Sequence, residues 1–187
     1  MDELLDLHRV NADRFSHLVH QVGDRWDLPT PCTDWSVRDL VRHLTSEQLW
    51  AHELLAGHTV EEVGDRFDGD VLDEDPVAAW DAAVAAAHAA FAEEGALDRT
   101  VVLSRGETAA HVYLEEMVSD LAVHGWDLAR AIGADEAMDP ATVRRVLLAW
   151  QPRAGQLAHS SMFAGPLDAP EDADEQTRLL ALFGREA

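Results

Sequence analysis

The sequence contains no lysine. All 14 basic residues are arginines, and they stand against 36 aspartates and glutamates. The formal net charge of -22 at pH 7 excludes a general affinity for nucleic acid or anionic lipid, because both of these ligands are themselves negatively charged. Isolated glycines such as Gly64 and Gly69 form no glycine-rich phosphate loop, so nucleotide binding of that kind is excluded as well.

Cysteine and long apolar runs are also scarce. Cys32 is the only cysteine, which excludes an internal disulfide and favours a reducing compartment. No stretch approaches the roughly 18 consecutive apolar residues of a membrane span. The start Met1-Asp2-Glu3 lacks the basic and apolar regions of a signal peptide. We therefore expect a cytoplasmic protein.

What the chain does contain is enough apolar sequence for one well-packed domain, which we expect to cover residues 1–187, since 47% of the residues are hydrophobic. Apolar residues recur at helical spacing in three segments, and Asp75-Pro76 and Asp139-Pro140 are typical of the starts of two more helices. The expected helices cover about residues 2–22, 37–56, 76–95, 110–132 and 140–157, and residues 175–185 form a further helical segment near the end. The sequence thus predicts an all-α fold with a four-helix bundle core and one long crossover connection.

Local signals refine this expectation. Ser36 with Asp39 three residues later is typical of a capping box at a helix start. Residues 57–74 form an acidic, glycine-containing loop that we expect to face solvent. Thr100 to Leu103 favours a short extended segment, so one small hairpin turning at Arg105-Gly106 is a further expectation.

Metal chemistry is the strongest functional signal. Asp120 and His124 are four residues apart, so they project from one side of the same expected helix. His43 takes the matching position beside the apolar stripe of the second helix, and packing the two stripes together would bring three ligands to one point. The alternative is an ordinary Asp-His ion pair. The remaining histidines considered are expected to be structural or solvated: His8, His17, His20, His58, His88 and His159.

A family resemblance adds to this reading. Residues 31–44, PCTDWSVRDLVRHL, and residues 120–133, DLAVHGWDLARAIG, resemble two signatures of the DinB-like metal-binding proteins, and residues 172–180 are also similar. The branch is the one related to the N-terminal domain of mycothiol-dependent maleylpyruvate isomerase. The resemblance implies a DinB-like four-helix bundle with one divalent ion at His43, Asp120 and His124. Separately, the absence of lysine and the alanine-rich run from Ala82 to Ala90 indicate a GC-rich coding genome and an actinobacterial type of host.

One ligand departs from the family pattern. The isomerase has glutamate, and many DinB-like proteins have histidine, where this chain has the shorter Asp120. Glu47 and Glu116 each lie one turn from a ligand and are second choices for the shell. Asp127 is a candidate to orient an imidazole from outside the shell. We expect zinc, with nickel or another divalent ion as alternatives, because three protein ligands and an open position are typical of catalytic zinc.

Three functions remain open at this point. The first, implied by the resemblance, is a transferase or isomerase that uses mycothiol or another small thiol as co-substrate and acts on an electrophilic substrate. The second is metal-dependent hydrolysis with Glu47 accepting a proton. The third is a non-catalytic metal-binding or regulatory protein, and a homodimer is compatible with each.

Three other residues complete the expectations. Cys32 is expected to be a packing residue and not a nucleophile or a fourth ligand. Trp35 and Trp126 are expected near the site.

Overall fold

The computed structural model describes residues 2–157 and 165–187, and it confirms the all-α class. His159, expected to be structural or solvated, lies outside the described residues. The α-helices are α1 (Asp2–Gln21), α2 (Val37–Leu55), α3 (Val60–Val63), α4 (Pro76–Ala92), α5 (Ala110–Ile132), α6 (Pro140–Trp150), α7 (Ala154–Leu157) and α8 (Glu175–Leu182). Two short 3-10 helices, η1 (Ala96–Asp98) and η2 (Gln151–Arg153), and the strands β1 (Thr100–Leu103) and β2 (Gly106–Ala109) complete the set.

The chain divides into two compact units, residues 1–135 and residues 136–187. The expectation of a single domain over residues 1–187 stays a prediction. None of the described helices combines the length and the apolar character that a bilayer crossing requires.

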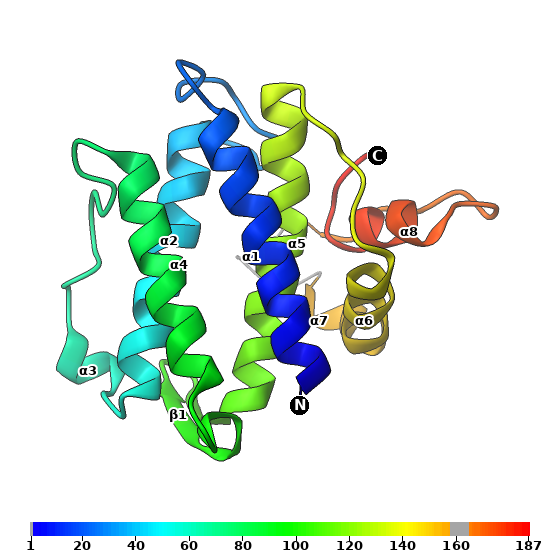
Figure 1. Cartoon of the computed structure of the whole chain (residues 1–187). Coiled ribbons are helices and arrows are strands. Elements are labelled where there is room, and N and C mark those ends of the chain that lie inside the picture. The colour runs from blue at the N-terminus through cyan, green and yellow to red at the C-terminus, as the bar shows by residue number, and fades with distance from the viewer. Residues whose placement is uncertain (1, 158–164) are drawn as a thin grey trace. The chain divides into compact units, whose positions relative to one another are not determined.

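The first unit is built on its four long helices. α1 packs against α4 and α5, and α2 packs against the same two helices, so the four lie alongside one another (Figure 1). Their apolar faces meet in one core, which holds Phe15, Leu40, Leu44, Trp80 and Leu128 among its fully buried side chains. Because burying a large apolar side chain contributes about 1.5–3 kcal/mol, this core fixes how α2 and α5 face each other.

The start of α2 is fixed by the expected capping box. The Ser36 hydroxyl accepts a hydrogen bond from the Asp39 amide at 3.2 Å, and the Asp39 carboxylate accepts one from the Ser36 amide at 3.1 Å. An N-cap of this kind stabilises a helix by roughly 1 kcal/mol. His43 follows seven residues after Ser36, so the cap also sets the position of the imidazole along the bundle.

The acidic connection after α2 is only partly the solvent-facing loop expected for residues 57–74. It contains the short helix α3, and Val63 and Leu72 are buried. Asp70 accepts a hydrogen bond from Arg38 on α2 at 2.8 Å. Burial of Val63 and Leu72 holds this segment against the bundle, whereas its carboxylates face water.

The expected hairpin is present with a shifted turn. β1 and β2 are antiparallel, and Leu103 pairs with Gly106, so the turn residues are Ser104 and Arg105 rather than Arg105 and Gly106. α5 follows directly and covers residues 110–132 as expected.

In the second unit, the helix expected over residues 140–157 is interrupted. α6 ends at Trp150, η2 follows, and α7 begins at Ala154. Pro152 explains the break, because proline lacks an amide donor and disrupts a continuing helix. The expected C-terminal helical segment is α8, which packs against α6, and Phe183 beyond it is fully buried with its ring 5.7 Å from that of Trp150.

Candidate metal centre

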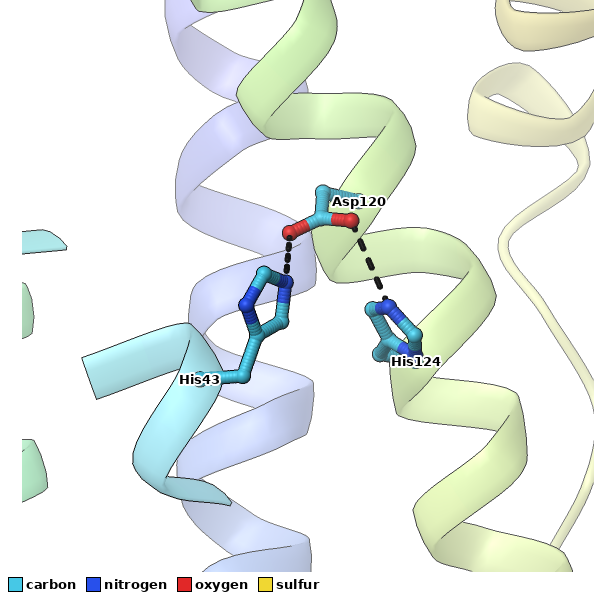
Figure 2. Close-up of side chains that lie close together, drawn as sticks. All are labelled: His43, Asp120 and His124. Atoms are coloured by element: carbon cyan, nitrogen blue, oxygen red, sulfur yellow. Dashed lines mark hydrogen bonds and ion pairs between the residues drawn. The ribbon is translucent and has the colours of Figure 1, made fainter. Parts of the chain in front are cut away.

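The structure brings the three predicted ligands together. His43 projects from α2, and Asp120 and His124 project from α5 toward it (Figure 2). Nε2 of His43 lies 3.0 Å from Oδ2 of Asp120, and Nε2 of His124 lies 3.4 Å from Oδ1 of the same carboxylate. One ligand atom from each residue lies within 4.8 Å of those of the other two. Within residues 2–157 and 165–187, this is the one cluster of that kind.

The three side chains of the cluster are buried to different extents. The side chain of His124 is 2% exposed, that of Asp120 is 15% exposed and that of His43 is 25% exposed. The α5 side of the cluster is therefore enclosed by the core, whereas the α2 side is open to solvent. The side of His43 is therefore the more accessible one for a small molecule.

Asp127 fixes the orientation of His124. Its carboxylate is fully buried and lies 2.9 Å from Nδ1 of His124, so Nδ1 is the donor of this hydrogen bond. In a neutral imidazole the other nitrogen, Nε2, then carries a lone pair, and it faces the Asp120 carboxylate. Two acceptors at 3.4 Å repel each other unless a proton or a cation lies between them. The donor set therefore fits a divalent cation.

Trp35 covers both imidazoles. Its ring centroid lies 4.9 Å from that of His43 and 5.6 Å from that of His124, with which it is stacked. Trp35 comes from the connector before α2, where its carbonyl accepts hydrogen bonds from the backbone amide and the hydroxyl of Thr30, both at 3.0 Å. The ring thus restricts rotation of the two ligands and excludes water from one side of them.

A hollow of about 290 Å³ opens beside His43. We call it the α2 hollow, and its lining residues are Trp35, Arg42, His43, Ser46, Phe67, Asp68 and Gly69. Of these lining residues, the sequence indicated only His43 and Trp35 as part of the site. Two signals were present: Arg42 immediately precedes His43, and Phe67 is a large aromatic residue in an otherwise acidic loop.

The family model of the mycothiol maleylpyruvate isomerase N-terminal domain matches residues 8–129, which is more than half of the chain and includes all three clustered residues. The chain belongs to this family. Two uncharacterized proteins of Mycobacterium tuberculosis are each 32% identical over 192 residues, covering 99% of this chain and 98% of the relative.

Solved structures agree on the fold of this family member. Two structures of the mycothiol-dependent maleylpyruvate isomerase, one of them a point mutant, align with 92% of this chain and 78% of the other. The mutant has a TM-score of 0.65 at 18% identity, and the second structure has 0.60 at 19%. The family resemblance that the sequence indicated is thus confirmed.

The two acidic residues named as second choices stand just outside the cluster. Glu116 forms an ion pair with Arg105 of the hairpin turn at 2.6 Å. Burial raises the pKa of Glu47 to about 7, and the charge of Asp120 adds to this effect. Burial lowers the pKa of His43, but the charge and hydrogen bond of Asp120 outweigh it, so this pKa ends above its usual value. Asp120, although shorter than glutamate, reaches both histidines, at 3.0 Å from His43 and 3.4 Å from His124.

Other expectations around the site have mixed outcomes. Trp35 lies at the cluster as expected. Trp126 is buried on α5 with the Arg130 guanidinium 4.1 Å above its ring, and its place near the site stays a prediction. Cys32 is half-buried in the connector and is not a member of the ligand cluster. His20 and His58 are exposed and paired with Asp81 and Glu53 respectively. Together with the exposed His17, they are solvated as the sequence suggested.

Proposed function

We propose that His43, Asp120 and His124 hold one divalent cation, with zinc preferred over nickel and other ions, and that the protein is a mycothiol-dependent or other small-thiol-dependent transferase or isomerase. The observation that carries the proposal is the convergence of the three ligand atoms within 4.8 Å. Family membership and the mycothiol-dependent structural neighbours support the thiol part.

Three protein ligands leave a coordination position for a reactant, which is the arrangement of a catalytic rather than a structural zinc site. When bound, the cation would lower the pKa of a thiol and so supply a thiolate nucleophile at neutral pH. Two residues that are not ligands position and shield the site. Asp127 keeps Nε2 of His124 directed at the centre, and Trp35 shields the two imidazoles from water.

The first experiment measures metal content by mass spectrometry on protein purified without an affinity tag. We expect about one divalent ion per chain in the wild type, as three ligands bind one ion. His43→Ala and His124→Ala should both lose it. His20→Ala is the matched control, because His20 is also paired with an aspartate, Asp81, at 2.9 Å but lies outside the cluster. Folded wild-type protein that takes up no added zinc, nickel or cobalt would reject the site.

The second experiment tests the thiol. Cobalt replaces zinc at such sites and gives a sulfur-to-metal absorption band when a thiolate binds, so mycothiol added to the cobalt protein should produce that band. The band should be absent from His124→Ala. Turnover of an electrophilic substrate that proceeds equally well without any thiol would contradict the proposal and favour metal-dependent hydrolysis instead.

A further inference from the structure

The α2 hollow combines three kinds of surface beside the proposed metal site. Trp35 and Phe67 supply aromatic rings, Arg42 supplies a positive charge, and His43 connects the hollow to the ligand cluster. Its volume of about 290 Å³ corresponds to the liquid volume of roughly ten water molecules. A reactant of about ten non-hydrogen atoms therefore fits beside the ion.

The guanidinium of Arg42 makes only weak contacts within the protein, so it is available to bind an anion. Its guanidinium lies 3.4 Å from the Asp39 carboxylate and 3.3 Å from the Gly69 carbonyl oxygen, both longer than a strong charge-assisted hydrogen bond. By contrast, Arg38, one turn earlier on α2, approaches Asp70 to 2.8 Å. The side chain of Arg42 is also 42% exposed, so an incoming anion meets its donors without a large rearrangement.

We propose that the α2 hollow binds the second reactant, a small organic molecule with a single carboxylate. Arg42 donates hydrogen bonds to that carboxylate, Trp35 and Phe67 contact the carbon skeleton, and the reactive end faces the ion. This inference rests on the proposed function and adds the substrate class to it. A bidentate guanidinium-carboxylate contact fixes orientation as well as affinity, which suits a residue beside a reaction centre.

Asp68 limits the charge that the hollow accepts. It is the other charged residue of the lining besides Arg42 and His43, and it is exposed. A second carboxylate on the ligand would meet Asp68 after the first had taken Arg42. The hollow is therefore suited to a monocarboxylate, and Asp68→Asn should improve the binding of dicarboxylates relative to monocarboxylates.

The test uses the full-length cobalt-loaded protein and two probes, 3-mercaptopropionate and its neutral amide, 3-mercaptopropionamide. Both place a sulfur at the ion, but only the first has a carboxylate for Arg42. Titration of the sulfur-to-cobalt band gives a Kd for each probe after correction for thiol ionisation. We expect the wild type to prefer the carboxylate by roughly tenfold, the size of one charge-assisted hydrogen bond.

Arg42→Gln should reduce this preference to about one, and Arg42→Lys should retain part of it, because lysine keeps the charge without the planar fork. Arg38→Gln is the matched control, since it removes the same charge one turn away and should keep the wild-type ratio. Equal losses in Arg42→Gln and Arg38→Gln would assign the preference to the general field of α2 and overturn the inference.

The two proposals fail differently. Bands with both probes and equal Kd values in the wild type would leave the metal-thiol function standing and overturn the carboxylate site. A cobalt protein that gives no band with either probe would contradict the metal-thiol function and the inference with it.

Discussion

Replacing Asp127 by asparagine tests the metal centre through a residue that is not a ligand. The side chain is fully buried and accepts the Nδ1 hydrogen bond of His124 at 2.9 Å. Asparagine has nearly the same shape, and its amide oxygen can still accept from Nδ1. What the substitution removes is the negative charge that holds the imidazole in this tautomer and makes Nε2 a stronger donor to a cation.

The expected magnitude follows from the type of hydrogen bond. A hydrogen bond to a charged group contributes about 1.5–3 kcal/mol, against about 0.5–1.5 kcal/mol for a neutral pair. The difference is about 1–1.5 kcal/mol, which corresponds to a loss of metal affinity approaching tenfold. This value lies at the lower end of the 10- to 100-fold range for residues that support metal ligands.

Competition for zinc against a chromophoric chelator measures this loss, with circular dichroism to show that the apoprotein remains helical. Asp81→Asn is the control, because Asp81 is also paired with a histidine, His20, and removal of that exposed pair should leave zinc affinity unchanged. A change of less than about twofold in Asp127→Asn, well below the range for such residues, would refute the reasoning. Equal losses in both variants would refute it as well.

Three further predictions concern the surroundings of the site and the core. Trp35→Ala should weaken zinc binding by less than about tenfold, because it removes a cover and not a ligand; the chelator competition measures this. Ser36→Ala should cost roughly 1 kcal/mol through the lost N-cap and lower Tm by about 2–4 °C in calorimetry. Burial, with the charge of His88 adding to it, lowers the pKa of His8 from 6.5 to about 4. As the pH falls, His8 is therefore protonated near pH 6.5 in the unfolded chain but only near pH 4 in the folded chain. Between pH 7 and pH 5 the wild type should lose about 2 kcal/mol of stability at this residue. Urea titrations should show His8→Phe losing less over that interval.

Much of the fold could be predicted because its signals are local. α5 covers residues 110–132 as expected, since its apolar stripe is long and Gly133 ends it with a positive φ of 69°. The capping box of α2 depends on residues three apart. The interruption after Trp150 had a local signal too, Pro152, which the helix expected over residues 140–157 did not take into account.

The metal cluster divides in the same way. Spacing on α5 alone places Asp120 beside His124, because residues four apart share one side of a helix. Placing His43 against them required the correct packing of two apolar faces and the family resemblance. Arg42 and Phe67 escaped the sequence analysis because they come together only through the path of the acidic loop over α2. No periodic pattern encodes that path.

The charge of the site implies an order of events for the proposed function. Asp120 and Asp127 carry negative charge close to the two histidines, Glu47 adds charge when ionised, and the whole chain has a net charge of -22. These charges attract a divalent cation and repel a carboxylate. Arg42 alone cannot reverse that balance, so an anionic reactant would bind well only with a cation neutralising the carboxylates beside it. A cation held by His43, Asp120 and His124 would supply the counter-charge for an anion in the α2 hollow, so an apoprotein should bind carboxylates weakly even with Arg42 intact.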